Sequence, residues 1–181
     1  MSAVPHIVVI GAGTLGLCSA VNLAQRGARV TVLDADAIAS GSSGRSVGVV
    51  GTQYTDAFEI QLRVHALRQF HEWERLGLSF HRIGYLRLAR HAHQMELLTQ
   101  SVALQADAGF TARVYTANEL SRIVPHICTE GLAGGILGPD NGYLDPHQMC
   151  DLLVRLIKQH GGAVHQFRRL VGVARTVGGY V

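Results

Sequence analysis

The chain has 181 residues, of which 48% are apolar and 16% are charged, and this balance excludes an intrinsically disordered protein. Its formal net charge is only +3, and its lysines and arginines form no run of five or six, so we expect no nucleic-acid partner. The three cysteines are far apart and lack CxxC spacing, which argues against a disulfide framework or a zinc site. No targeting signal is visible, so we expect a cytoplasmic protein. We also expect no bound metal, because no acid or Cys motif accompanies the His91-Ala-His93 spacing.

The first 34 residues predict a strand, a helix and a second strand. His6-Ile-Val-Val-Ile10 is a β-branched run, which is typical of a strand buried on both faces of a parallel sheet. Residues 14–26 have helical spacing, and Gly27 is placed to end that helix in the left-handed conformation. Residues 29–33 predict the next strand, so the whole segment matches a βαβ unit.

The rest of the chain predicts a mixture of helices and strands around an ordered, Ser- and Gly-rich loop at residues 40–51. Capping patterns mark the beginnings of three helices, namely Asp56 with Glu59, Thr116 with Glu119, and Asp145 with Pro146 and Gln148. The expected elements are helices over 56–76 and 94–108, a short helix from Thr116, a helix from Asp145 to Gly161-Gly162, strands over 84–88 and 134–137, and short strands with a turn in 163–181.

A glycine-rich turn joins the first strand to the first helix. Gly11-Ala-Gly-Thr-Leu-Gly16 fits GxGxxG, and Asp34 ends the next strand, which is the context that supports a dinucleotide fingerprint. Gly11 permits the tight turn, Gly13 lets the backbone approach the pyrophosphate, and Gly16 allows close packing of helix on strand. The helix terminus favours the anion, and Asp34 would accept hydrogen bonds from the adenosine ribose. Asp34 also argues against NADP, but the fingerprint leaves NAD and FAD open.

Three further segments carry a family resemblance. They are Ser42-Ser-Gly-Arg-Ser-Val-Gly48 after the acid, the GPDNGYLDP run at 138–146, and the Gly-Gly-Ala-Val run at 161–164 followed by Val171. With these segments the chain resembles, over nearly all its length, the D-amino-acid oxidase superfamily of flavoproteins. Glycine oxidase, the sarcosine oxidase β-type subunit and D-amino-acid dehydrogenase belong to that superfamily.

The resemblance implies a fold and a domain arrangement. The expected fold is α/β, a Rossmann-like FAD-binding domain of the GR2 type with part of an α+β substrate domain inserted. The implied FAD-binding domain is discontinuous and incomplete, at residues 1–80 and 145–181. Residues 81–144 would be part of the substrate domain.

The resemblance also implies that FAD is the cofactor and suggests its contacts. Ser42 and Ser43 would lie near the pyrophosphate and ribityl chain, the loop at 48–50 beside the flavin ring, and the backbone at Val171 against the adenine. Arg45 stands near the position where some relatives carry a His that bonds the flavin, so no covalent attachment is expected there. The full set of implied cofactor residues is Gly11, Gly13, Thr14, Leu15, Gly16, Asp34, Ala35, Ser42, Ser43, Arg45, Gly48, Val49 and Val171.

The implied reaction is oxidation of the C–N bond of an amine or amino acid, with hydride transfer to the flavin and hydrolysis of the imine. No residue is assigned as catalytic; Tyr54, His81 and Tyr85 could line a substrate cavity, although each is more often a packing residue. Two alternatives stay open, a flavin dehydrogenase of a small hydroxy acid and a truncated or split FAD-binding subunit without activity alone. The second arises because the family's remaining strands and its residues for the substrate carboxylate come after the point where this chain stops. A partner chain would then supply the missing half or accept electrons.

Overall fold

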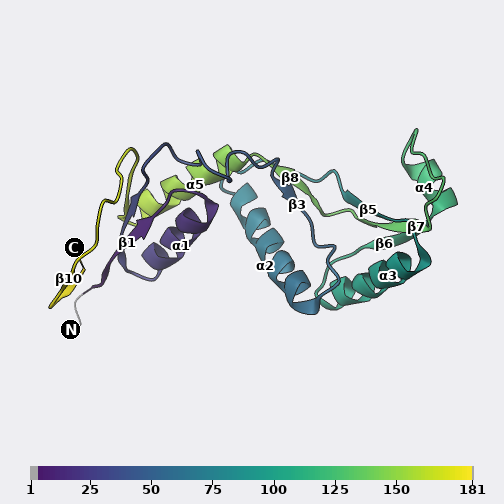
Figure 1. Ribbon diagram of the computed structural model, residues 1–181, viewed down its shortest axis with the longest axis horizontal. Helices are drawn as coiled ribbons and strands as arrows, with labels where there is room; N and C mark the ends of the chain where they lie inside the picture. Colours follow the sequence, from purple (N-terminus) through teal and green to yellow (C-terminus); the bar gives the residue numbers. More distant parts are fainter. Residues whose placement is uncertain (1–3, 181) are drawn as a thin grey trace. The chain divides into compact units, whose positions relative to one another are not determined.

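The computed structural model describes residues 4–180, which divide into two compact units (Figure 1). Unit 1 contains the described residues up to Val47 together with those from Asp145 onward, and unit 2 contains Gly48–Leu144. The domain boundary expected between residues 144 and 145 coincides with a boundary between the units. Residues 48–80, which we expected in the FAD-binding domain, pack within unit 2.

Unit 1 is built on a parallel sheet with the strand order β1-β2-β9. Its register places Val8 opposite Thr31 and Val32 opposite Val164. Helices α1 and α5 lie side by side, although more than 100 residues separate them in the sequence (Figure 1). The elements are β1 (His6–Ile10), α1 (Thr14–Gln25), β2 (Arg29–Leu33), α5 (Pro146–Gln159) and β9 (Ala163–His165). The predicted βαβ unit is therefore present.

The ends of both helices follow from local sequence. Gly27 has a φ of +85° and its N–H bonds to the carbonyl of Ala24 at 2.9 Å, which closes the last turn of α1 as predicted. The Asp145 carboxylate accepts a hydrogen bond from the His147 N–H at 2.8 Å, and Pro146 occupies the first helical position of α5.

The core of unit 1 lies between the sheet and its two helices. Leu17 of α1, Val32 of β2 and Leu153 of α5 are fully buried there. Val8 and Ile10, by contrast, are 49% and 53% exposed, so the prediction that the first strand is buried on both faces is wrong. The reason is that both helices cover the same face, and in residues 4–180 the other face borders a hollow of about 750 Å³. Strand β11 (Gly179–Tyr180) also lines that hollow. It pairs antiparallel with β10 (Arg175–Thr176).

Unit 2 contains two antiparallel sheets and three helices. The first sheet has the order β3-β8-β4 and the second has the order β5-β7-β6, with α3 packed on the second (Figure 1). The strands are β3 (Val49–Val50), β4 (Phe80–His81), β5 (Tyr85–Ala89), β6 (Arg113–Thr116), β7 (Gly134–Gly138) and β8 (Gly142–Leu144). The helices are α2 (Ala57–Glu74), α3 (Ala92–Asp107) and α4 (Ala117–Ile123).

The helices of unit 2 begin where their capping residues predict. Asp56 accepts the Glu59 N–H at 3.0 Å at the start of α2, and Thr116 and Glu119 form the reciprocal capping box of α4. Helix α2 packs against α3 and β4, which is why its residues belong to unit 2. A cluster of Ala89, Leu98 and Ile136 forms a core between the second sheet and α3. None of the helices in residues 4–180 is long and apolar enough to cross a membrane.

Candidate dinucleotide site

The turn between β1 and α1 requires glycine at two positions. Gly11 has a φ of +104°, in the region that favours glycine, and its N–H bonds to the Leu33 carbonyl at 2.8 Å. A Cβ at Gly16 would overlap the carbonyl oxygen of Gly11 and lie 3.5 Å from Cγ1 of Val9. Any side chain at residue 16 would therefore push the helix away from the turn and the strand.

The amino terminus of α1 presents unpaired N–H groups. Gly13 is the N-cap and its carbonyl accepts the N–H of Leu17 at 2.9 Å, but it has no side chain to cap the first turn. The N–H groups of Leu15 and Gly16 thus have no partner within the helix. Together with the helix dipole, they make this terminus a favourable place for an anion such as a pyrophosphate.

Ser43 reaches the same terminus from a loop 29 residues further along the chain. Its Oγ accepts the Thr14 N–H at 3.0 Å, and a Cβ at Gly13 would lie 3.0 Å from that Oγ. The next residue, Gly44, donates its N–H to the Ala39 carbonyl at 2.9 Å. A Cβ at Gly44 would come within 2.5 Å of the His147 imidazole, so glycine lets the loop lie against α5.

His147 is a neighbour of the site that our sequence reasoning missed. Its proximity depends on α5 packing beside α1, and nothing in the sequence around Gly44 indicates that contact. The Asp145 cap fixes the first turn of α5, and hence the start of the helix that carries this imidazole.

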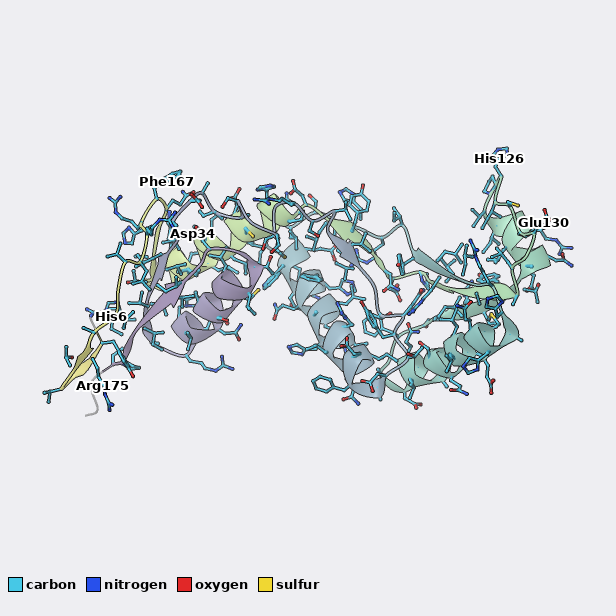
Figure 2. The ribbon with its side chains drawn as sticks, in the orientation of Figure 1. His6, Asp34, His126, Glu130, Phe167 and Arg175 are labelled. Atoms are coloured by element: carbon cyan, nitrogen blue, oxygen red, sulfur yellow. The ribbon has the colours of Figure 1, made fainter. Side chains whose placement is uncertain are left out.

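Asp34 connects the glycine turn to the end of β2. Its Oδ2 accepts the Ala12 N–H at 2.6 Å, and its Oδ1 accepts the Asp36 N–H at 2.9 Å. The Asp34 backbone carbonyl accepts the Arg168 N–H at 2.7 Å, and Figure 2 shows Asp34 and Phe167 at the same end of unit 1. The carboxylate is half-buried, and each of its oxygens can accept a further hydrogen bond, for example from a ribose hydroxyl.

The remaining implied residues of unit 1 differ in their positions. Thr14 is half-buried beside the turn, and Ala35 is half-buried next to Asp34. Leu15, at the start of the helix, is 84% exposed. Ser42 and Arg45 are exposed on the loop that carries Ser43. Val171 is 95% exposed, and the expected contact of its backbone with the adenine stays a prediction.

Gly48 and Val49 lie in unit 2. Gly48 has a φ of +67° and its carbonyl accepts the Leu144 N–H at 3.1 Å. Val49 pairs with Tyr143 across β3 and β8 and is 53% exposed. An exposed, strand-fixed segment of this kind offers a rigid edge to a ligand.

Two thiols lie behind the turn on the packed side of α1. Burial raises the pKa of Cys18 to about 11, and the neighbouring Cys150 adds to that rise. Burial also raises the pKa of Cys150, whose Sγ lies 4.0 Å from Oγ1 of Thr14. Both thiols are therefore neutral near pH 7 and are packing groups, not nucleophiles.

The geometry of unit 1 fits a dinucleotide. The glycine turn, the unpaired helix N–H groups, Ser43 and Asp34 meet at one place, at the carboxyl ends of two parallel strands. In residues 4–180 no group of histidines, cysteines and acids is arranged to hold a metal ion.

Comparison with known proteins decides which dinucleotide the site binds. Residues 6–181 match the family described as DAO, FAD dependent oxidoreductase. The chain belongs to this family. FAD is therefore the cofactor, and the expected resemblance is confirmed over residues 6–181.

Relatives in this family differ in what they oxidise. The chain is 26% identical to a 4-methylaminobutanoate oxidase (formaldehyde-forming) of Paenarthrobacter nicotinovorans, over 88% of this chain and 20% of that protein. It is 23% identical to mitochondrial sarcosine dehydrogenase of Homo sapiens, over 93% of this chain and 19% of that protein. The chain thus spans about a fifth of the length of these two relatives.

Several solved structures share the fold. L-proline dehydrogenase from P. horikoshii superposes with a TM-score of 0.87 at 24% identity, covering 100% of this chain and 51% of that one. L-α-glycerophosphate oxidase from Mycoplasma pneumoniae with FAD bound has a TM-score of 0.81 at 18% identity, covering 99% and 49%. These likenesses confirm the expected α/β, Rossmann-like fold.

Proposed function

We propose that this chain is the nucleotide-binding portion of an FAD-dependent oxidoreductase that oxidises the C–N bond of an amine or amino acid. The observation that carries dinucleotide binding is the meeting of Ser43, Asp34 and the helix terminus at the glycine turn, and the family match over residues 6–181 supports FAD as that dinucleotide. The names of the relatives support the C–N part, because 4-methylaminobutanoate, sarcosine and L-proline all carry a secondary amine.

The roles of the residues follow from their contacts. The N–H groups of Leu15 and Gly16 would bind the pyrophosphate, and Ser43 would hold the loop that closes over it. Asp34 would hold the adenosine ribose through its free lone pairs. When bound, FAD supplies the acceptor for the hydride that leaves the carbon next to the substrate nitrogen, after which water hydrolyses the imine.

A second proposal concerns how much polypeptide the active enzyme needs. In the described sheet β1 pairs only with β2, and Val8 and Ile10 on its open face are about half exposed. An unpaired strand edge beside exposed apolar residues favours pairing with a further segment. We therefore propose that turnover needs a further polypeptide, and that the 181 residues alone are a split or partial FAD-binding unit.

A cofactor assay and a substrate panel test the main proposal together. Protein purified from cells is heated, and the released cofactor is separated by chromatography; we expect FAD. The panel compares N-methyl amino acids, amino acids, simple amines and small hydroxy acids, scored by anaerobic bleaching of the flavin in the longest natural form of the protein. Bleaching only by hydroxy acids would support the alternative dehydrogenase, and bound NAD in place of FAD would overturn the proposal.

A further inference from the structure

The beginning of α5 lies against the beginning of α1. Helix α1 follows β1 directly and α5 ends just before β9, so both helices begin at the carboxyl end of the parallel sheet, and they lie side by side (Figure 1). The Sγ of Cys150, in the second turn of α5, lies 4.0 Å from Oγ1 of Thr14, the first residue of α1. Residues at the very start of α5 are therefore close to the N–H groups that we assign to the pyrophosphate.

His147 is the residue of α5 that extends toward this place. It precedes Cys150 by three positions, and residues three apart lie on the same side of a helix. Side chains of a helix lean toward its amino terminus, so the imidazole reaches beyond the level of Thr14. The side chain is exposed, so it is accessible to a ligand bound in front of α1.

A second contact places the imidazole beside the Ser-rich loop. A Cβ at Gly44 would lie 2.5 Å from Cε1 and 2.6 Å from Nε2 of His147, so the ring lies directly against the backbone of Gly44. Ser43, the residue before, accepts the Thr14 N–H at 3.0 Å. Ser43 and His147 therefore approach the same helix terminus, one from the loop and the other from α5.

The ring nitrogens of His147 are available to a ligand. The backbone N–H of this residue bonds to the Asp145 carboxylate at 2.8 Å, which fixes the first turn of α5. Neither ring nitrogen has a hydrogen-bond partner within residues 4–180. An imidazole carries at least one N–H donor whatever its charge, so the ring can donate to an anion.

Two carboxylates lie at this end of unit 1. Asp34 bonds to the glycine turn at the end of β2, and Asp145 caps α5. A bound pyrophosphate adds negative charge to the same end, and like charges repel each other. A side-chain donor at this end offsets part of that repulsion, and His147 is held in position to supply it.

We propose that His147 binds the pyrophosphate of FAD through its imidazole N–H, beside the N–H groups of Leu15 and Gly16. The inference rests on the proposed function, since it names a further residue of that FAD site. It extends the site from the βαβ unit to α5, which lies more than 100 residues away in the sequence. It also explains why residue 44 is a glycine, because a side chain there would displace the imidazole.

Titrations of the 181-residue chain with FAD, ADP and adenosine test the proposal, because ADP carries two linked phosphates and adenosine carries none. His147→Ala is expected to weaken the binding of FAD and ADP about tenfold and that of adenosine less than about twofold. His147→Gln keeps an N–H donor of similar reach and should recover most of the loss. The matched control is His160→Ala, at the exposed far end of α5, which should bind all three as the wild type does.

Two measurements distinguish a direct contact from mere support of the loop. In proton–nitrogen spectra of the histidine rings, ADP should shift the His147 signal, which His147→Ala identifies by removing it, and adenosine should leave it in place. In a Ser43→Ala background, His147→Ala should still weaken ADP binding about tenfold, because a direct contact does not depend on the Ser43 hydroxyl. An unshifted His147 signal, equal losses for ADP and adenosine, or a loss that disappears in the Ser43→Ala background would overturn the inference.

Failure of this inference can be told apart from failure of the proposed function, because FAD binding to the wild type is measured in the same series. If the wild type and His147→Ala bind FAD equally well, the role of His147 is refuted and the flavoenzyme stands. If the wild type binds neither FAD nor ADP, both are refuted.

Discussion

The hydroxyl of Ser43 accepts the backbone N–H of Thr14 at 3.0 Å, across 29 residues of sequence. This bond holds the Ser-rich loop against the first turn of α1, next to the N–H groups that we assign to the pyrophosphate. It also brings the loop close to Gly13, since a Cβ at residue 13 would lie 3.0 Å from Oγ of Ser43. The glycine turn and the loop therefore act as one structure.

Gly13→Val is expected to abolish FAD binding. The new side chain would press on Ser43 and occupy the space in front of the helix terminus, where the pyrophosphate binds. Gly41→Ala is the matched control. Gly41 lies on the loop that carries Ser43, and a Cβ at this position would meet no atom within 4 Å. Fluorescence titration with FAD measures both, and equal affinity in the two variants would show that the site is misplaced.

Asp34→Asn is expected to weaken both FAD binding and the fold. The charged acceptor for the N–H groups of Ala12 and Asp36 is lost, at about 1–3 kcal/mol in the free energy of unfolding. Urea unfolding and FAD titration measure the two effects. Asp36→Asn serves as the control, since this side chain is exposed and forms no hydrogen bond or ion pair within residues 4–180, and it should match the wild type in both assays.

The flavin is expected to be bound without a covalent link in this chain. Arg45, exposed on the loop, stands where a linking His would be sought, and a guanidinium does not form that bond. Acid precipitation should leave the yellow cofactor in the supernatant. Flavin fluorescence that stays with the washed pellet contradicts this prediction.

The 181-residue chain alone is expected to bind FAD weakly and to lack turnover. The open edge of β1 and the exposed Val8 and Ile10 predict that unit 1 lacks a packing partner in this form. Anaerobic mixing of the FAD-loaded chain with the amine and amino-acid panel provides the measurement. Flavin bleaching on the order of 1 per second or faster, by monomeric protein, would refute it.

Cys128 is expected to react with an alkylating reagent before the other two thiols. Cys128 is exposed, whereas burial raises the pKa of Cys18 to about 11 and raises that of Cys150. Since the thiolate is the reactive form, only about one Cys18 in a thousand is reactive at pH 8, and its rate rises as the pH approaches 11. Pulsed alkylation followed by mass spectrometry should label Cys128 first; urea-unfolded protein, in which all three are accessible, is the control. Early labelling of Cys18 at pH 8 contradicts the buried position.

Much of the fold and part of the candidate site could be predicted because they depend on short-range chemistry. The Asp145 cap, the left-handed Gly27 and the Thr116–Glu119 box each involve residues within a few positions of one another, and all three lie where the sequence indicates. The glycine spacing and Asp34 likewise follow from one βαβ unit, whose geometry is nearly fixed by its strand and helix lengths.

Contacts between distant segments depend on how whole helices and strands pack, which the local sequence does not reveal. The approach of His147 to Gly44, the bond from Thr14 to Ser43, and a cavity of about 280 Å³ in unit 2 that Tyr54 and Tyr85 both line all join segments that local patterns do not relate. The open face of β1 is a further case, since its apolar residues indicate a buried strand but burial depends on what packs against it. The helices, strands β1, β2, β5 and β7, the glycine turn and the family could be predicted from the sequence, because propensity and spacing are local. Which side chains share a cavity depends on the packing of whole elements, and only the folded chain decides it.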